Sequence, residues 1–260
     1  MKFVLLRMLS VVLIGTGNVA HHLFDAFYPK EDIQVIQVFG RNIRSLSSFE
    51  AKCAVTSVPE NIIDADVYIV AVNDDAISEV SKLLVTKKGM VVHTSGSVSK
   101  DNVVAARKGV FYPLQTFSPK KEVDFSSIPI CIEADTLQDL KILEVLAHKI
   151  SERVHLVSSA QREKLHLAAV FVNNFTNHMY VIGQEICSKE ELPFDLLKPL
   201  ISETANKLRF LSPDKAQTGP AKRNDILTMQ KHLDALENPI QKKLYQLISE
   251  SIKEQNEKKL

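Results

Sequence analysis

The sequence has no surplus of either charge, few cysteines and no long apolar run. Its 260 residues include 32 lysines and arginines against 31 aspartates and glutamates. This balance argues against a nucleic-acid-binding groove, which needs a basic surplus. Because no apolar run approaches the roughly 20 residues of a membrane-spanning helix, we expect no membrane insertion. The proportions of hydrophobic residues (45%) and charged residues (24%) are typical of a globular protein.

The three cysteines, Cys53, Cys131 and Cys187, are odd in number and far apart in the sequence. They form neither a C-x-x-C pair nor a cluster with histidines, so the sequence predicts no metal site. Reduced thiols of this kind are typical of a cytoplasmic protein, which is the location we expect.

The N-terminus has some features of a secretory signal peptide. Lys2 and Arg7 are basic and Leu9 to Ile14 is mostly apolar, but this run is too short and no small-residue cleavage site follows it. We therefore expect Met1 to Met8 to be a short extension that precedes the first strand.

Short apolar segments alternate with helical patterns as far as residue 157, which predicts βαβ units and a largely parallel sheet. From residue 158 onward only helical patterns remain. The predicted fold class is therefore α/β, with a doubly wound, mostly parallel Rossmann domain over 1–157 and an all-α domain over 158–260. Strands are expected at 11–14, 33–39, 67–72, 90–94, 110–112, 128–132 and 154–157, and helices at 18–27, 45–52, 76–84, 136–150, 160–187, 194–211, 226–236 and 240–253.

A glycine-rich turn with the pattern G-x-G-x-x-A directly follows the first strand and opens the first helix, at residues 15–20. The first glycine permits a tight turn, the second lets the backbone approach a pyrophosphate, and the alanine allows the helix to pack closely on the strand. The helix start supplies free N–H groups and a partial positive charge for the phosphates. We therefore predict that a dinucleotide is bound by Gly15, Thr16, Gly17, Asn18 and Val19.

The choice of cofactor is made at the end of the second predicted strand, where an NAD site usually has an acidic residue for the ribose 2′-hydroxyl. This chain has Arg41 and Asn42 after Phe39-Gly40, with Arg44 close behind. The guanidinium group of an arginine pairs well with a 2′-phosphate, so Arg41 favours NADP(H) over NAD(H). The alternative is that Arg41 is an ordinary surface arginine.

Polar residues end the third and fourth predicted strands. Parallel strands end at one edge of the sheet, where ligands of such folds bind. We assign Val72 and Asn73 from the third strand end, and Ser95 and Gly96 from the fourth, to cofactor binding near the nicotinamide or its ribose.

Each of these strand ends also has a structural interpretation. Asp74 and Asp75 have the residue type that caps helix N-termini. Ser95 and Ser97 have the type that shapes loops. The sequence leaves both alternatives open.

A polar stripe runs along the long predicted helix 160–187. Its members are Arg162, His166, Asn173 and Asn177, which are offset by 4, 7 and 4 residues and share one face at about 100° per residue. Such a stripe is costly unless it faces water, a ligand or a partner. We interpret it as the wall of a substrate cleft, with catalytic roles for three residues: His166 as a general acid, Asn173 orienting a carbonyl or imine, and Asn177 beside them. A hydrogen-bonded contact between helices is the alternative.

The segment Thr218 to Asp225 is a polar connection between predicted helices and carries two cations and a carboxylate. Loops of this composition often bind anionic ligands or a partner subunit. The alternative is a plain connection between two helices.

Five stretches of the sequence occur in the same order in a known family: residues 11–23, 94–97, 112–117, 162–177 and 218–225. On them the chain resembles the bacterial Rossmann-like NADP oxidoreductases with a C-terminal helical domain of unassigned function, which are related to the deazaflavin-dependent NADP oxidoreductases. It is more distantly similar to pyrroline-5-carboxylate reductase and the β-hydroxyacid dehydrogenases. The resemblance implies a dinucleotide-binding N-terminal domain and a homodimer through the C-terminal helices, but no particular substrate.

Three positions depart from these relatives. Tyr112 stands where many family members have histidine before Pro-Leu, and Asn224 stands where glycine is common before the aspartate. The β-hydroxyacid dehydrogenase pattern has a catalytic lysine a few residues before the helix asparagine. Here Lys164 lies on another face of the helix, so the dehydrogenase mechanism does not transfer directly.

The sequence as a whole favours an enzyme that transfers a hydride between NADP(H) and a small carbonyl, imine or hydroxyl compound. A non-catalytic dinucleotide-binding redox sensor or scaffold is the main alternative. A reductase that passes hydride between NADP and a deazaflavin or flavin is the third.

Overall fold

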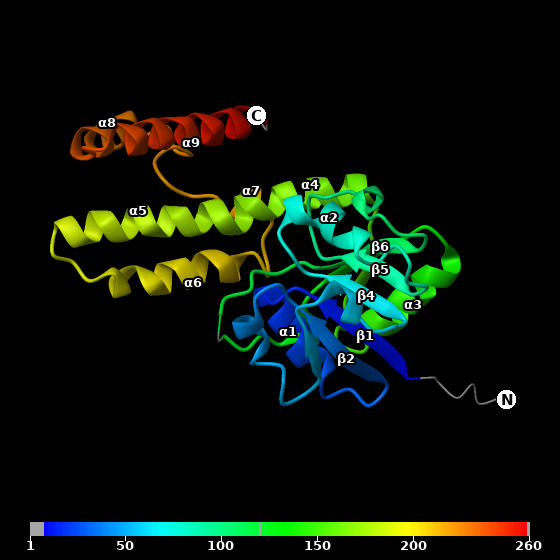
Figure 1. The fold of residues 1–260 in the computed structure, drawn as a ribbon. Coiled ribbons are helices and arrows are strands. Elements are labelled where there is room, and N and C mark those ends of the chain that lie inside the picture. Colours follow the sequence, from blue (N-terminus) through cyan, green and yellow to red (C-terminus); the bar gives the residue numbers. More distant parts are fainter. Residues whose placement is uncertain (1–7, 120, 259–260) are drawn as a thin grey trace. The chain divides into compact units, whose positions relative to one another are not determined.

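The computed structural model describes residues 8–119 and 121–258, so the predicted extension before the first strand lies outside the described residues except for Met8. By their internal contacts the residues form two compact units, which divide between Val170 and Phe171. Figure 1 traces the chain through both. The predicted domain boundary between residues 157 and 158 stays a prediction.

The first unit is built on a single eight-stranded sheet with the order β3-β2-β1-β4-β5-β6-β7-β8 in the part of the chain that the structure describes. β1 to β6 run parallel where they pair, β7 runs antiparallel to β6, and β8 runs parallel to β7. This confirms the predicted Rossmann fold, with its mostly parallel sheet and reversal of strand order beside β1. The strands are β1 (Leu9–Ile14), β2 (Ile33–Phe39), β3 (Ala54–Thr56), β4 (Val67–Val70), β5 (Met90–His93), β6 (Lys108–Pro113), β7 (Ile130–Ala134) and β8 (Val154–Leu156).

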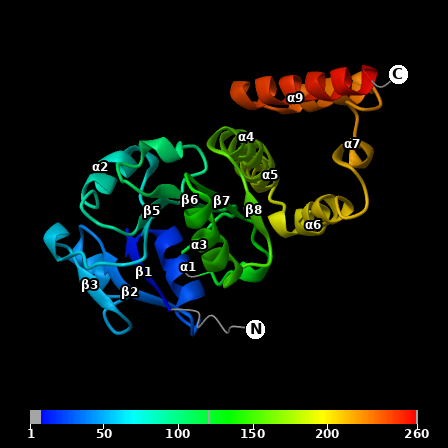
Figure 2. The same ribbon diagram turned by 90° about the vertical axis from the view of Figure 1, so that its right-hand side faces the viewer.

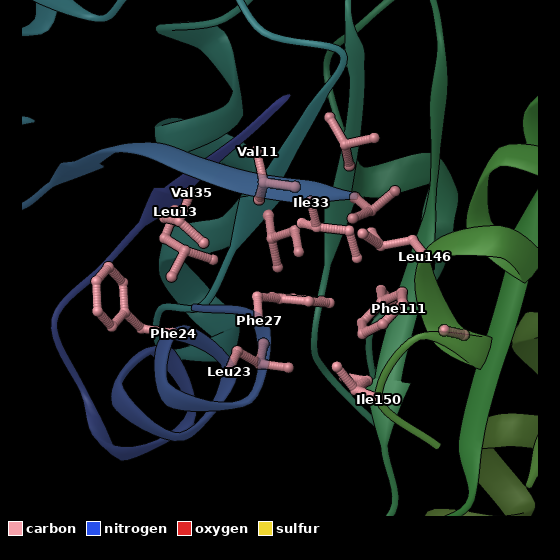
Figure 3. Packing of buried hydrophobic residues seen from close by; sticks show 14 of the residues in the cluster. Val11, Leu13, Leu23, Phe24, Phe27, Ile33, Val35, Phe111, Leu146 and Ile150 are labelled. Carbon is pink, nitrogen blue, oxygen red and sulfur yellow. The ribbon is translucent and has the colours of Figure 1, made fainter. Parts of the chain in front are cut away.

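Helices cover both faces of this sheet, which is why its central strands are apolar throughout. Val11 and Leu13 of β1 pack into one hydrophobic cluster, while Val12 and Ile14 pack into another on the opposite face. The first cluster lies under α1 and α3, and Figure 3 shows the side chains of α1 meeting those of β1 and β2. Figure 2 shows α2 across the sheet from α1 and α3. The helices of this unit are α1 (Asn18–Phe27), α2 (Ile77–Lys82), α3 (Leu137–His148) and α4 (Ser159–Ala169).

The predicted helix over 45–52 is wrong. The chain there forms a short 3-10 helix at Ile43–Leu46, which the Asn42 side chain caps, and continues in turns. These turns lead into β3, a three-residue edge strand that the sequence prediction missed because it is too short to show a period. The other 3-10 helices are at Pro59–Asn61, Asp74–Ala76, Lys100–Asn102, Phe125–Ser127 and Phe194–Leu197.

The second unit is all-helical, as predicted. The predicted helix over 160–187 is not uniform, because α4 gives way to a π-helical segment at Val170–Phe175 before α5 begins. The helices of this unit are α5 (Thr176–Lys189), α6 (Lys198–Lys207), α7 (Pro213–Ala216), α8 (Ile226–Ala235) and α9 (Pro239–Glu257). In the described residues of the chain, no helix combines the length and the apolar character needed to cross a membrane.

Candidate active site

The glycine turn after β1 brings the ends of two parallel strands into contact. Gly15 has a φ of +121°, a conformation that side-chain-bearing residues rarely adopt. A Cβ at this position would lie 2.2 Å from the carbonyl oxygen of Ala71 and 3.3 Å from a methyl group of Val72, both directly after β4. The turn therefore sits where the strand order reverses, which is where folds of this class bind their ligands.

The start of α1 is left open. Gly17 is its N-cap with an extended backbone (φ −81°, ψ −178°), no side chain caps the helix, and its first turn carries no acidic residue. Apart from Gly17 and its two chain neighbours, no described residue has an atom within 4 Å of the point where a Cβ on Gly17 would stand. The free N–H groups of the first helical turn thus face space that a pyrophosphate fits.

The neighbouring turn residues are held by contacts of their own. The Asn18 side chain donates a hydrogen bond to the carbonyl oxygen of Phe117 at 3.1 Å. Val19 is half-buried against the core. Thr16 lies against the end of β2, because a Cβ on Gly40 would stand 2.6 Å from its methyl group.

The end of β2 presents unpaired positive charge. Arg41 and Arg44 are exposed, and in the described part of the chain the Arg41 guanidinium has neither an ion pair nor a hydrogen bond. The Asn42 side chain accepts a hydrogen bond from the Arg44 backbone N–H at 3.0 Å and so fixes the turn that carries both arginines. No acidic residue stands at this strand end, and the set fits a 2′-phosphate.

The loops after β4 and β5 are tied together. The Ser97 hydroxyl donates a hydrogen bond to Asp74 at 2.5 Å, so this carboxylate bridges to the next loop and does not cap the helix that follows it. The Ser95 hydroxyl oxygen accepts the backbone N–H groups of Ser97 and Val98, each at 3.1 Å. Ser95 therefore shapes its loop, while Asn73 remains exposed beside Asp74.

His93, the last residue of β5, lies under this loop and was not singled out from the sequence. It is fully buried, and its Nδ1 accepts the backbone N–H of Ser95 at 3.1 Å. Burial, reinforced by the positive charge of Arg162, lowers the pKa of His93 to about 4. The ring is therefore neutral near pH 7 and acts as a fixed acceptor for the loop.

The prediction that the polar stripe lines a cleft is wrong for Arg162. This residue is 1% exposed, and its guanidinium pairs with Glu133 of β7 at 2.8 Å. It also donates to the carbonyl oxygens of Ser95 (3.1 Å) and Val98 and to the Ser159 hydroxyl. Its role is to hold α4 against the sheet and the loop after β5.

His166, one turn further along α4, does reach the carboxyl edge of the sheet. Its Nδ1 lies 3.3 Å from the hydroxyl of Tyr112 in β6, and the two rings meet edge to face. Both pack on Gly96, where a Cβ would stand 2.6 Å from Nδ1 of His166 and 2.9 Å from the Tyr112 ring. The structure thus brings together His166, Gly96 and Ser95, three of the residues selected from the sequence, and adds Tyr112.

Asn173 and Asn177 belong to the second unit and are exposed. The spacing that placed them on one face with His166 assumed a regular α-helix, whereas residues 170–175 form a π-helical turn with wider spacing. Their catalytic roles stay predictions. A π-helical turn inside a long helix is nevertheless common at functional sites.

The polar connection before α8 is held mostly by its own residues. Lys222 donates to the carbonyl oxygen of Gln217 at 2.7 Å, and Asp225 caps α8 by accepting from the Thr228 backbone N–H (3.1 Å) and hydroxyl (2.8 Å). Asn224 has a φ of +54°, a backbone conformation that glycine adopts most easily. The plain connection between helices accounts for these three residues and leaves Arg223 exposed.

Two family models match the chain. Residues 10–95 match the model described as NADP oxidoreductase, coenzyme F420-dependent, and residues 128–252 match a domain of unknown function (DUF2520). The first match covers the glycine turn and the ends of β2, β4 and β5, and the second covers His166 and the helical unit. The chain matches no protein among those with curated descriptions.

Solved structures extend this comparison over nearly the whole chain. A Bacteroides fragilis protein assigned as an NADP oxidoreductase is 41% identical, with a TM-score of 0.88 over 96% of this chain and 99% of its own. An Aspergillus terreus reductive aminase in complex with NADPH and ethyl levulinate (13% identity, TM-score 0.68, 95% and 94% covered) shares the fold. So does 1-pyrroline-5-carboxylate reductase from Streptococcus pyogenes (12%, 0.63, 95% and 98%). The chain belongs to the family of Rossmann-like NADP oxidoreductases with a C-terminal helical domain, whose cofactor is a nicotinamide dinucleotide.

Proposed function

We propose that this oxidoreductase transfers a hydride between NADP(H) and a small carbonyl, imine or hydroxyl compound. The observation that carries the proposal is the placement of two features at one edge of the sheet. The uncapped start of α1 behind Gly15 stands at the carboxyl end of β1, and the Tyr112–His166 pair stands at the carboxyl end of β6. Phosphate binding and a polar group for substrate chemistry are thus provided within the same unit.

The cofactor, when bound, supplies or accepts the hydride, and the chain's residues bind and orient it. We assign the pyrophosphate to the turn and first helical N–H groups, the 2′-phosphate to Arg41 and Asn42, and the nicotinamide side to the two loops after β4 and β5. The residues of this set are Gly15, Thr16, Gly17, Asn18, Val19, Arg41, Asn42, Val72, Asn73, Ser95 and Gly96.

His166 is the residue we assign to the reacting oxygen or nitrogen of the substrate. It is half-buried beside Gly96 at the mouth of the loop after β5, and one ring nitrogen is engaged by Tyr112 while the other is left for a ligand. Asn173 and Asn177, from the segment that follows α4, complete the proposed catalytic set. We also propose that the protein is located in the cytoplasm.

The preference for NADPH is tested by fluorescence titration of the purified protein with NADPH and with NADH. We expect NADPH to bind at least about tenfold more tightly, because a charge-assisted hydrogen bond contributes about 1.5–3 kcal/mol. Arg41→Ala is expected to remove that preference while leaving NADH binding unchanged. Arg153→Ala, which removes another exposed arginine of the first unit, is the matched control and should change neither affinity.

The titration, combined with assays of turnover, also separates the proposed enzyme from the redox sensor and from the deazaflavin reductase. Equal binding of NADPH and NADH would contradict the assignment of Arg41 but not the oxidoreductase. Tight NADPH binding without turnover, in a screen of small carbonyl and imine compounds, would favour the redox sensor. Optically detected hydride exchange with a deazaflavin would favour that carrier as the substrate.

We also propose that the second unit pairs with the same unit of a second copy. Among its described residues only Ala221 and Met229 are buried hydrophobic residues, whereas large apolar side chains such as Phe210 (86%) and Leu227 (78%) are exposed. Apolar surface on this scale is uncommon on a monomer. A second copy carries the same exposed apolar surface, so pairing of two such units would bury the apolar surface of both.

Sedimentation analysis tests this pairing, with an expected mass twice the 29.1 kDa of the chain. Leu227→Glu in α8 should raise the dimer dissociation constant at least about tenfold, because it places a charge in an apolar interface. Leu137→Glu in α3 of the first unit, where the side chain is 79% exposed, is the matched control and should leave the dimer intact. A wild-type chain that remains monomeric at micromolar concentrations would contradict the proposal.

A further inference from the structure

The hydrogen bond between Tyr112 and His166 can run in either direction, and the burial of the tyrosine favours one of them. Tyr112 is 9% exposed, and Nδ1 of His166 is the one hydrogen-bond partner of its hydroxyl in the described part of the chain. A buried hydroxyl left without an acceptor costs about 1–3 kcal/mol. Donation from the tyrosine to Nδ1 avoids that cost, whereas the reverse bond would leave the tyrosine hydrogen without an acceptor.

Donation to Nδ1 decides which nitrogen of the ring carries the hydrogen. A neutral imidazole has one N–H and one acceptor nitrogen, so a ring that accepts at Nδ1 carries its hydrogen at Nε2. We propose that Tyr112 is a positioning residue that fixes neutral His166 with its hydrogen on Nε2, so that His166 presents a hydrogen-bond donor to the substrate's carbonyl oxygen or imine nitrogen. The role toward the substrate rests on the proposed function, whereas the fixed tautomer does not.

The surroundings of the pair support this assignment. Burial raises the pKa of Tyr112 to about 12, so its hydroxyl keeps its hydrogen over the whole working range of pH. The absence of a side chain at Gly96 lets both rings pack on its Cα, which limits their rotation. Arg162, one turn earlier on α4, anchors the helix to Glu133, so the His166 backbone is fixed as well.

A fixed Nε2–H suits a hydride transfer to a polar double bond. As hydride passes from the bound cofactor to the carbon, negative charge develops on the attached oxygen or nitrogen, and a donor already aimed at that atom stabilises it. A proton from water then completes the alcohol or amine, and His166 keeps its Nε2 hydrogen. A ring with its lone pair on the same side would repel that charge. Tyr112 thus selects the tautomer that assists reduction and does not itself touch the reacting atoms.

The test is the ring tautomer of His166, read from long-range ¹H–¹⁵N correlations of ¹⁵N-histidine-labelled protein at pH 8. The His166 signals are assigned by their absence in His166→Asn. Tyr112→Phe removes the hydroxyl and keeps the ring on Gly96. Tyr245→Phe is the matched control, since Tyr245 makes the same kind of bond to Nδ1 of His232, at 2.9 Å in the second unit.

We expect wild-type His166 to show only the form with hydrogen on Nε2, and Tyr112→Phe to show exchange between both forms. Tyr245→Phe should alter the His232 signals and leave those of His166 unchanged. Hydrogen on Nδ1 in the wild-type protein, or a His166 pattern identical in Tyr112→Phe, would overturn the proposal. Adding NADP⁺ tests the proposed function separately: the His166 signals should shift, and a fixed tautomer without such a shift would count against the site but not against the role of Tyr112.

Discussion

Gly15→Ala is expected to damage both the stability of the protein and its binding of NADPH. The φ of +121° costs an alanine about 1–3 kcal/mol, and its Cβ would stand 2.2 Å from the carbonyl oxygen of Ala71. Relief of that overlap must separate the ends of β1 and β4, which lie at the centre of the sheet. We expect the melting temperature to fall by roughly 5 °C or more, with NADPH binding lost in the fluorescence titration.

Gly17→Ala is the matched variant, two residues away, and should behave differently. The Gly17 backbone is one that alanine adopts freely, and beyond the two chain neighbours no described residue has an atom within 4 Å of the added Cβ. The melting temperature should stay unchanged, while NADPH affinity falls at least about tenfold because the methyl group stands where the pyrophosphate approaches. If Gly17→Ala bound NADPH with wild-type affinity, the phosphates would have to bind elsewhere. If Gly15→Ala kept the wild-type melting temperature, the geometry of the turn would be contradicted.

Arg162→Met is expected to lower the free energy of unfolding by about 3–5 kcal/mol. The substitution leaves Glu133, whose side chain is 12% exposed, without its cation, and it removes donors from the carbonyl oxygens of Ser95 and Val98. Breaking one half of a buried ion pair costs more than the pair itself contributes, because the remaining charge stays buried. Urea unfolding followed by circular dichroism measures the change.

An exposed ion pair provides the comparison for this variant. Lys198 and Asp195 lie 2.7 Å apart with side chains 63% and 75% exposed, and Lys198→Met should change the unfolding free energy by less than about 1 kcal/mol. Arg162→Met combined with Glu133→Leu should recover part of the loss, since no charge then remains buried. A cost for Arg162→Met as small as that for Lys198→Met would mean that α4 is held by other contacts.

The first unit was predictable because its signals are local. The turn at Gly15 and Gly17 lies between a strand and a helix that are adjacent in the sequence, and the bounds of α1 and β2 match the prediction residue for residue. Buried parallel strands are apolar throughout, so their positions show clearly in one dimension. The helix expected over 45–52 failed because a few polar residues near a turn carry no such period.

The candidate site was only partly predictable, because its polar partners are distant in sequence. A polar residue on an apolar helix indicates a ligand or a partner without saying which, and for Arg162 the partner is Glu133, 29 positions away. His93 ends an apolar strand and gave no separate signal, whereas Tyr112 was noted only as a departure from the family pattern and not as a partner of His166. Only the packing of α4 across β6 shows that Tyr112 faces His166.

The scarcity of buried apolar residues in the second unit bears on how the chain reaches its folded state. A group of helices whose described residues include only two buried hydrophobic ones has little driving force to fold alone, whereas the first unit has an extensive core. If the second unit gains its stability by association, its unfolding midpoint rises with protein concentration while that of the first unit does not. Dilution would then unfold the helices of the second unit first and leave the nucleotide-binding first unit folded. The concentration of the protein, and not only its sequence, would therefore govern whether both units are folded.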